Sequence, residues 1–416
     1  MKSCTTQMVS FTDSLALNLN SRGQTDVIYF DFAKAFDSVN HDVILDKLRY
    51  KFGIKGKLLN FFIDYLSGRK QRVVIDNKFS SFSPVQSGVP QGSILGPILF
   101  VLFIDDIANV LDKDTHILMY ADDTKIWREI CSIEDQNKLQ ADINALHTWS
   151  VNNKIKFHPN KCKVVRITLK INKLVYNYTL NGNVLAQSES ECDLGVTVSQ
   201  NLKWNRHHSI IISKAAQKLG LVKRVCSFTL DKISRKILFL SIVRSQFEHC
   251  SIVWSPTTST QLLYFERILK RGIKWIFNEQ YSVYSNNQYF DRLRELDILP
   301  MYLKFRHNDL VLFHKIVYNL VPIDLPEYLI LSTDNNSDRQ HYYQRQTRNF
   351  NDSDRLKIKS KVTPRIDAFK HSFFQRTYTL WNDLPFCIRS IDSSDSFRIK
   401  LKEHLWLIAI TNLDKT

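Results

Sequence analysis

Three carboxylates could together hold a divalent metal ion: Asp31 and the adjacent pair Asp122-Asp123. Asp31 ends the apolar run "VIYFD", and the pair lies between the strand-like runs "ILMY" and "TKIW". An ionised carboxylate at a strand end among apolar residues is costly unless a cation compensates it. If that strand and the hairpin are neighbours in one sheet, Asp31 and Asp122 meet at one edge. Such oxygen ligands suit Mg²⁺, which typically takes one or two protein carboxylates together with phosphates and water.

Two Mg²⁺ ions at this edge would indicate phosphoryl-transfer chemistry. Held about 3.5–4 Å apart, two such ions stabilise the attacking and the leaving oxygens of an in-line displacement. The alternative is a plain turn, because Asp side chains often bond the local backbone there. A second acid pair, Asp105-Asp106, follows an apolar helical run and is interpreted as a solvated helix end.

A third feature is the segment "SGVPQGSILGPILF", residues 87–100, which is rich in glycine and proline and runs into an apolar helix. Because glycine lacks Cβ, a backbone of this kind can approach a flat ligand closely. The alternative is a structural turn. The segment lies between Asp31 and Asp122 in the sequence, so it is a candidate wall of the same site.

These residues are positioned by a mixed α/β block that extends to about residue 200. Alternating apolar residues and turn residues predict short strands, with tight turns at Asp76-Asn77 and Asn181-Gly182. A helix is expected to begin with Ser38 as its N-cap. Further along the chain, apolar residues recur at helical spacing. The helical stretches are 205–250, 258–277, 300–320 and about 365–407, and the polar segment 333–355 is predicted to be an exposed linker or loop.

The net charge of +16 is unevenly distributed. Residues 1–130 contain 15 basic and 15 acidic residues, so the whole excess lies in residues 131–416. A basic half indicates a polyanionic partner, either nucleic acid or an anionic membrane surface. Plain solubility is the alternative explanation.

The seven cysteines are widely spaced and form no CxxC pair. This pattern argues against a disulfide framework, a disulfide-linked partner or a zinc knuckle, and it favours an intracellular compartment, with nothing to distinguish nucleus from cytoplasm. The N-terminus lacks the apolar core of a signal peptide. The longest apolar run, Ile94–Ile104, is too short to span a bilayer, so no membrane partner is expected.

Taken together, these motifs resemble the reverse transcriptases of non-long-terminal-repeat retrotransposons, of the LINE type and the jockey-like group. "YFDFAKAFDSVNHDVIL", "SGVPQGSILGPILF" and "YADD" look like the first three palm motifs, in order and at the right spacing. "WSVNNKIKFHPNKCKVV" is similar to the fourth motif and "DLGVTV" to the fifth. "KILFLSIVRSQFEHCSIVW" resembles the thumb, and "LWNDLP" is similar to part of the C-terminal region.

The resemblance implies an α+β fold. It predicts a right-hand polymerase palm, an antiparallel sheet with flanking helices, followed by a mostly helical thumb and C-terminal region. The expected divisions are a palm at 1–200, a thumb-like region at 201–277 and a C-terminal region at 278–416. Only a remnant of the fingers, at 1–25, is expected, so the chain is identified as an N-terminally truncated member.

The resemblance also implies a metal centre with two Mg²⁺ ions, for which Mn²⁺ is an alternative. Asp31 would bind both ions, and the backbone carbonyl of Phe32 could add a ligand. Asp122 would be the second principal ligand, with Asp123 more peripheral. The expected activity is RNA-directed DNA polymerisation from deoxynucleoside triphosphates, with an RNA template and a DNA primer as partners.

Other roles follow from the same motifs. Phe36 is expected to be a steric gate against the ribose 2′-hydroxyl, the alternative being an ordinary core phenylalanine. Gln91 and Gly92 would line the incoming nucleotide. Lys161 lies where the family has a lysine proposed to protonate the pyrophosphate leaving group, the alternative being a solvated loop lysine.

The fifth motif is the primer grip, implied at Leu194 and Gly195. Here Asp193 stands next to it, and a negative charge is expected to weaken the grip on primer phosphates. Two hypotheses follow: a reverse transcriptase, or a catalytically inactive remnant that only binds nucleic acid. A host-adopted binding protein is a weaker third. We expect that the family activity is the right functional description and that the missing fingers leave this chain alone with little activity.

Overall fold

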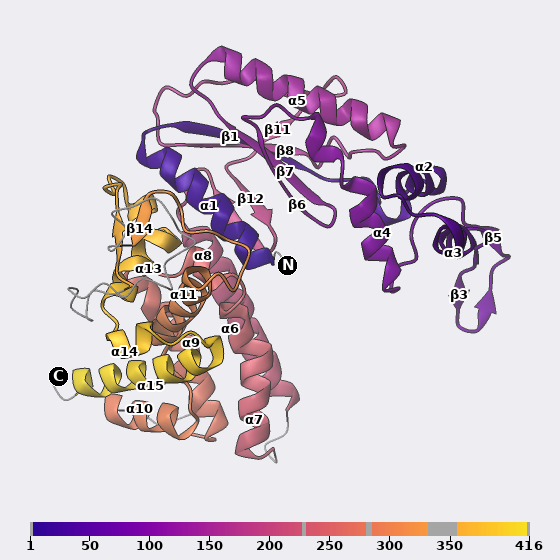
Figure 1. Ribbon diagram of the computed structural model, residues 1–416. Coiled ribbons are helices and arrows are strands. Elements are labelled where there is room, and N and C mark those ends of the chain that lie inside the picture. Colours follow the sequence, from indigo (N-terminus) through magenta and orange to yellow (C-terminus); the bar gives the residue numbers. More distant parts are fainter. Residues whose placement is uncertain (1–2, 227–229, 280–284, 332–355, 414–416) are drawn as a thin grey trace. The chain divides into compact units, whose positions relative to one another are not determined.

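The computed structural model describes residues 3–226, 230–279, 285–331 and 356–413. Its contacts divide the chain into two compact units (Figure 1). Residues 22–193 form the sheet unit, and residues 1–21 with 194–416 form the helical unit. The predicted linker 333–355 lies outside the described residues. The division into palm, thumb and C-terminal region stays a prediction.

A five-stranded sheet with the order β11-β8-β1-β7-β6 forms the centre of the sheet unit. The central strand β1 (Gln24–Phe30) pairs antiparallel with β7 (Asp123–Glu129) and with β8 (Lys163–Thr168). β6 (His116–Tyr120) is antiparallel to β7, whereas the short β11 (Ala186–Gln187) is parallel to β8. The predicted antiparallel sheet is therefore confirmed for four strands, with β11 as the exception.

Helix α5 (Ile133–Asn152) covers one face of this sheet (Figure 1). Its Leu139, Ile143 and Leu146 are fully buried in the same core cluster as Ile28 of β1. The apolar spacing of these residues at intervals of three and four predicted this contact. The helix thus holds the centre of the sheet against one side of the core.

Helix α2 (His41–Asp46) begins two residues later than expected. Its N-cap is Asn40, whose side-chain oxygen accepts from the amide of Val43 at 3.1 Å. Ser38 instead donates its hydroxyl to the carbonyl of Ala33 at 2.8 Å. The prediction of Ser38 was wrong because serine and asparagine are about equally good N-caps, so residue type alone does not choose between them.

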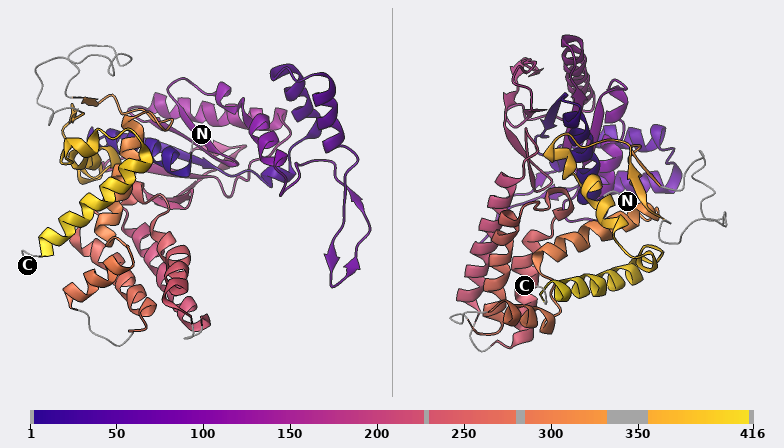
Figure 2. Two further views of the ribbon diagram at one scale, coloured as in Figure 1. Left: turned by 60° about the horizontal axis from the view of Figure 1, so that its bottom comes forward. Right: turned by 90° about the vertical axis from the view of Figure 1, so that its left-hand side faces the viewer.

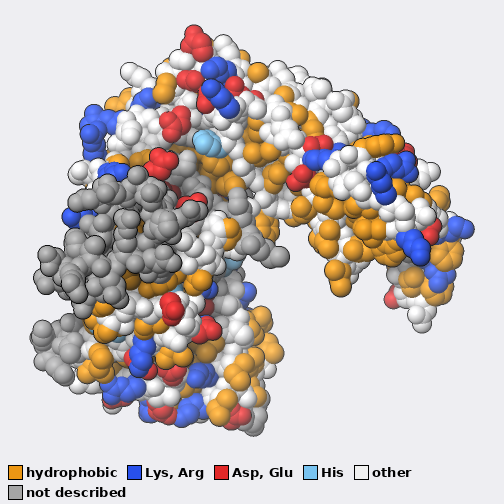
Figure 3. Space-filling view, viewed as in Figure 1, with side chains coloured by type: hydrophobic (Ala, Val, Ile, Leu, Met, Phe, Trp, Pro, Cys, Tyr) orange, Lys and Arg blue, Asp and Glu red, His pale blue; other side chains and the backbone are white. Residues whose placement is uncertain are grey.

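A hairpin after helix α3 (Gly56–Leu66) projects away from the sheet (Figure 2). Its tip is the predicted turn at Asp76-Asn77, because Ile75 pairs with Lys78. Hydrophobic side chains gather on the surface of this part of the sheet unit, over α3, the hairpin and α4 (Leu95–Ile104) (Figure 3). The strands of the hairpin are β2 (Lys70–Gln71), β3 (Val74–Ile75), β4 (Lys78–Phe79) and β5 (Ser83–Pro84).

The second predicted hairpin is also confirmed. β9 (Thr179–Leu180) pairs antiparallel with β10 (Asn183–Val184), and Asn181-Gly182 forms the turn. The sheet unit ends with β12 (Ser190–Asp193), and β13 (Val196–Ser199) follows in the helical unit.

The helical unit contains the helices predicted beyond residue 205. Helix α1 (Cys4–Asn20) packs among them, against α8 (Ser251–Trp254) and α12 (Asp367–Lys370). Among the described residues, no helix is both long and apolar enough to cross a bilayer. The larger helices are α6 (Asn205–Val225), α7 (Lys232–Leu238), α9 (Ser259–Ile276), α10 (Asn286–Glu295), α11 (Met301–Val317), α13 (Phe373–Asn382) and α15 (Ser394–Leu413).

Candidate functional site

The three acids lie at one edge of the sheet. Phe30 of β1 pairs with Thr124 of β7, so Asp31, which follows Phe30, and Asp123, which precedes Thr124, end neighbouring strands at the same edge. Asp122 lies in the two-residue turn between β6 and β7. The structure therefore confirms that the "YADD" segment is a tight hairpin tip beside the end of β1.

The turn itself is strained in a way typical of two-residue hairpins. Ala121 has a φ of +53°, a left-handed conformation that such turns require and that non-glycine residues rarely adopt. Tyr120 pairs with Asp123 on either side of it. This pairing fixes the register and leaves both acids exposed at the tip.

Negative charge accumulates at this edge. Burial raises the pKa of Asp123, and the nearby charges of Asp122, Asp193 and Asp31 raise it further, while Lys125 opposes the shift. A bound cation would relieve this repulsion. Within the described part of the chain, however, no three His, Cys, Asp or Glu side chains form a group that could hold a metal ion. Metal ligation by these acids therefore stays a prediction, compatible with the one or two carboxylates that Mg²⁺ typically takes.

The structure brings Lys161 to the same edge. Its Nζ lies 3.4 Å from Oδ1 of Asp31, and the two side chains are 60% and 42% exposed. The loop that carries Lys161 is fixed to the end of β1, because the amide of His158 donates to the carbonyl of Asp31 at 2.8 Å. Lys161 is an exposed loop lysine that contacts Asp31, and both its role in proton transfer and the solvated alternative stay open predictions.

The two phenylalanines after Asp31 pack into the core. Phe32 is buried and its ring stacks on Phe157 with centroids 4.6 Å apart, while Phe36 is partly buried against Phe100 at 4.6 Å. The backbone hydrogen bonds at this bridge use the carbonyl of Asp31 and the amide of Ala33. Phe36 therefore has a packing role, and its action as a gate is untested.

The glycine-rich segment packs onto the chain that follows β1. The amide of Gly88 donates to the carbonyl of Val39, and that of Val89 to the carbonyl of Phe36, both at 2.8 Å. Gly88 has a φ of +91°, and a Cβ there would lie 2.8 Å from Cα of Asp37. Glycine is thus required at this position because the segment closely approaches the protein's own backbone. This observation agrees with the alternative of a structural turn and not with approach to a ligand.

The two predicted nucleotide-binding residues differ in their surroundings. The side-chain amide of Gln91 donates to Oδ1 of Asp37 at 2.9 Å, so this exposed side chain is held in place. Gly92 has a φ of +79°, and a Cβ there would meet nothing within 4 Å. Both positions are accessible to a ligand, and their contact with a nucleotide stays a prediction.

The predicted primer grip is a turn with two left-handed residues, Leu194 at φ +46° and Gly195 at φ +81°. His249 supports it: its Nε2 lies 2.8 Å from the carbonyl oxygen of Leu194 and would be 3.0 Å from a Cβ on Gly195. The contact with the Cys250 thiol and the bond to the Leu194 carbonyl raise the pKa of His249 to about 9, although partial burial opposes the shift. The sequence carries no local signal for His249, since the two partners are 55 positions apart.

From the sequence we expected Asp193 to direct its negative charge towards the primer. In the structure it does not point outward. It forms a buried ion pair with Lys125 of β7, and both side chains are 5% exposed. Asp193 therefore has a buried positive partner, and its effect on a grip on primer phosphates stays a prediction.

The other acid pair, Asp105-Asp106, is also not simply solvated. Oδ1 of Asp106 lies 2.7 Å from Nζ of Lys47 and accepts from the indole nitrogen of Trp149 at 2.9 Å. Asp105 forms an ion pair with Lys51 at 2.9 Å. These acids connect the end of α4 to the residues after α2, which is a structural role.

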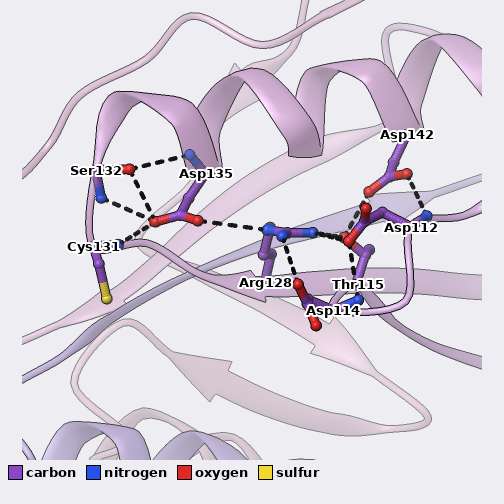
Figure 4. A network of polar contacts seen from close by, with 8 residues as sticks. All are labelled: Asp112, Asp114, Thr115, Arg128, Cys131, Ser132, Asp135 and Asp142. Carbon is purple, nitrogen blue, oxygen red and sulfur yellow. Dashed lines mark hydrogen bonds and ion pairs between the residues drawn. The ribbon is translucent and has the colours of Figure 1, made fainter.

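A polar network anchors the far end of β7 (Figure 4). Arg128, whose side chain is 4% exposed, lies 2.8 Å from Asp112 and 3.9 Å from Asp135 at the start of α5. Since Asp123 begins the same strand, this network helps to fix the strand that carries it. Sequence reasoning missed Arg128 because its partners come from two different places, the segment before β6 and the first turn of α5.

Comparison with known protein families shows to which class of protein this part of the chain is similar. Residues 2–205 match the family model for reverse transcriptase (RNA-dependent DNA polymerase). Together with the sheet and its acidic edge, this match shows that this part of the chain belongs to the reverse transcriptase family.

The curated relatives that match are proteins of mobile elements. The RNA-directed DNA polymerase from mobile element jockey of Drosophila funebris is 31% identical over 186 residues, 43% of this chain and 20% of that protein. The probable RNA-directed DNA polymerase from transposon BS of Drosophila melanogaster is 24% identical over 59% of this chain and 27% of that protein. The chain thus spans about a fifth to a quarter of the length of these relatives. Among solved structures, apo telomerase from Candida tropicalis aligns with 72% of this chain and 50% of its own, at 12% identity and a TM-score of 0.40.

Proposed function

We propose that this chain is an RNA-directed DNA polymerase that transfers deoxynucleotides to the 3′-hydroxyl of a DNA primer on an RNA template. The observation that carries the proposal is the convergence of Asp31, Asp122 and Asp123 at one sheet edge within a domain of the reverse transcriptase family. The raised pKa of Asp123 supports it, because the crowded carboxylates favour a bound cation.

In this proposal Asp31 and Asp122 hold two Mg²⁺ ions, with Asp123 and the carbonyl of Phe32 as further ligands. When bound, such ions make a primer hydroxyl a better nucleophile and neutralise the charge that develops on the leaving pyrophosphate. Lys161, whose Nζ lies 3.4 Å from Oδ1 of Asp31, would supply a proton to that leaving group.

The remaining residues select and hold the substrates. Gln91 and Gly92 line the incoming nucleotide, and the ring of Phe36 excludes a ribose 2′-hydroxyl. Leu194 and Gly195 position the primer end. The basic excess of residues 131–416 binds the template–primer backbone with little sequence preference.

A primer-extension assay on poly(rA)–oligo(dT) with Mg²⁺ and dTTP tests the proposal. Extension by the wild-type chain that Asp122→Asn abolishes would support the enzyme. No extension by the wild type would contradict polymerisation by this chain alone, for which little activity is expected. The matched control is Asp76→Asn. Asp76, like Asp122, lies in the turn of a two-residue hairpin, and it is far from the acidic edge in the sequence. Its own φ is positive. Equal activity of the wild type and Asp122→Asn would contradict the proposed metal centre.

The second candidate function is nucleic-acid binding without polymerisation, which the basic excess favours. If the wild type shows no extension, filter binding at several salt concentrations decides. A logarithmic affinity that falls linearly with the logarithm of the salt concentration identifies phosphate contacts. An affinity that is independent of salt would rule out this function as well.

A further inference from the structure

A cavity of about 400 Å³ lies inside the helical unit, between α11 and its neighbours α8 and α15. We call it the α11 cavity. The residues that α11 contributes to its wall recur every three to four positions, so they lie on one face of this helix. The charged residues of the lining are Glu248, Lys304, Lys315, Asp395 and Arg398.

The lining of the α11 cavity combines buried and exposed side chains. Ser251 is 2% exposed and His307 is 6% exposed, whereas Arg398 and Asp395 are exposed. The side chain of Lys304 lies between these extremes, at 17%. The cavity therefore opens at the surface and extends inwards, and its volume lies in the range of small-molecule sites.

Lys304 is the partly buried cation of this lining. Its Nζ lies 3.5 Å from Oε1 of Glu248, and the same oxygen lies 3.3 Å from Nε of Arg244. One exposed carboxylate thus serves two cations, at distances longer than those of a strong charged hydrogen bond. Burial lowers the pKa of Lys304, and the positive charges of Arg244 and Arg398 lower it further, while Glu248 opposes the shift. The ammonium group is therefore short of negative charge.

The charges at and beside the cavity leave an excess of two positive charges. Among the residues that the structure describes, neither Lys315 nor Arg398 forms an ion pair. The four cations are Arg244, Lys304, Lys315 and Arg398, and the two carboxylates are Glu248 and Asp395. Cations gathered around one cavity repel one another unless an anion joins them.

His307 shows the same shortage from within the wall. Its Nε2 lies 3.4 Å from the carbonyl oxygen of Arg398, whereas its buried Nδ1 has no hydrogen-bond partner in the described part of the chain. Burial lowers the pKa of His307 to about 4, and the positive charges of Lys304 and Arg398 lower it further. An anion bound beside Lys304 and Arg398 would oppose both shifts.

We propose that the α11 cavity binds a phosphate monoester, either on a small molecule or at the end of a nucleic-acid strand. Such a group carries about −1.5 to −2 charges at pH 7, which matches the excess of two, whereas an internal phosphate of a nucleic acid carries one. Arg398 would bind two phosphate oxygens through its planar guanidinium, and Lys304 would act as a point charge. The side chains of Asn308 and Ser251, 3.1 Å apart, offer further donors. This inference goes beyond the proposed polymerase and does not depend on it.

Direct binding tests the α11 cavity. Isothermal titration of the full chain with ribose 5-phosphate, in EDTA so that no metal contributes, is expected to show binding that Lys304→Met and Arg398→Gln each weaken about tenfold or more, because a charged hydrogen bond is lost. Asp395→Asn should strengthen binding, since it removes a negative charge from the lining. The matched control is Arg306→Gln, which removes the same charge from an exposed position of α11 outside the cavity and should leave the affinity unchanged.

Three outcomes would overturn the proposal. The first is equal weakening by Arg398→Gln and Arg306→Gln, and the second is weaker binding by Asp395→Asn. The third is equal affinity for ribose 5-phosphate and for dimethyl phosphate, a diester with a single charge. Arg398 is exposed, so its variant keeps the test valid even if Lys304→Met does not fold.

A short single-stranded oligonucleotide, with either a 5′-phosphate or a 5′-hydroxyl, separates the two sources of the phosphate. If the phosphorylated strand binds more tightly and Arg398→Gln abolishes the difference, the cavity receives a strand end. If the two strands bind equally while ribose 5-phosphate binds at the cavity, the ligand is a small molecule. If Arg398→Gln changes the affinity for neither ribose 5-phosphate nor the phosphorylated strand, the proposal fails.

Discussion

Lys125 of β7 forms an ion pair with Asp193 in the interior of the sheet unit. Burial raises the pKa of Asp193 and lowers that of Lys125, and in each case the partner's charge opposes the effect. Each group therefore keeps its charge through the other. The pair also lies close to Asp123, whose pKa both residues influence in opposite directions.

The first prediction concerns this ion pair. Asp193→Ala leaves the ammonium group of Lys125 buried without a partner, so the free energy of unfolding should fall by about 3–5 kcal/mol. Lys125→Met/Asp193→Leu should recover most of that loss, because it removes both charges. Urea unfolding of the wild type, of Asp193→Ala and of the double variant gives the three free energies of unfolding. The partly exposed pair of Lys163 and Glu191, 3.0 Å apart and 38% and 21% exposed, is the control, and Glu191→Gln should cost less than about 1 kcal/mol. Equal costs for the two pairs would contradict the role of burial.

The second prediction concerns sugar selection by Phe36. Phe36→Val should increase the use of UTP relative to dTTP on poly(rA) by about 10- to 100-fold, because it removes the ring that is proposed to clash with the 2′-hydroxyl. Ratios of kcat/KM measure the change. Phe100→Leu is the control, since it removes the ring that packs on Phe36 and keeps Phe36 itself. Unchanged discrimination in Phe36→Val would show that Phe36 is only a core residue.

The third prediction compares two glycines of the same segment. Gly92→Ala should cost only the strain of a left-handed alanine, about 1–2 kcal/mol, since its Cβ enters open space. Gly88→Ala should cost more, because its Cβ would collide with the backbone of Asp37. Urea unfolding gives both values. If the two variants are equally stable, the packing of Gly88 against Asp37 does not hold this segment in place.

The fourth prediction is a pH dependence that arises from His249. Its pKa in the folded chain, about 9, lies above the ordinary value of 6.5. The stability it contributes is therefore fully present below pH 6.5 and is lost as the pH rises through 9. We expect the Tm of the wild type to fall towards that of His249→Gln between pH 6.5 and 9. A constant difference in Tm over this range would show that the contacts with Cys250 and the Leu194 carbonyl do not stabilise the protonated form of His249.

Local patterns predicted much of the fold. The hairpin with Asp122, the turn at Asp76-Asn77 and the helix over α5 depend on residue spacing and turn chemistry within short windows, and the structure confirms them. That β1 and β7 are neighbours was not predicted. It was only the condition under which Asp31 and Asp122 would meet at one edge. The pairing of the two strands depends on hydrogen bonds between distant segments, which spacing does not encode.

What the sequence did not predict is the partners of charged residues. Asp193 finds Lys125 across 68 positions, and His249 finds Leu194 across 55. The charge of Asp193, next to the fifth motif, was therefore interpreted as exposed, although the fold buries it and pairs it with Lys125.

The central position of β1 has a consequence for how the chain reaches its native state. Phe30 must pair with Thr124 and Asp31 must meet Lys161, 130 positions away, before the edge exists. Closing such long loops costs entropy before any contact repays it, and non-local pairing of this kind folds slowly. During synthesis the edge cannot be completed until β8 has left the ribosome. The acidic edge therefore forms only after the chain has been made through β8, which ends at Thr168.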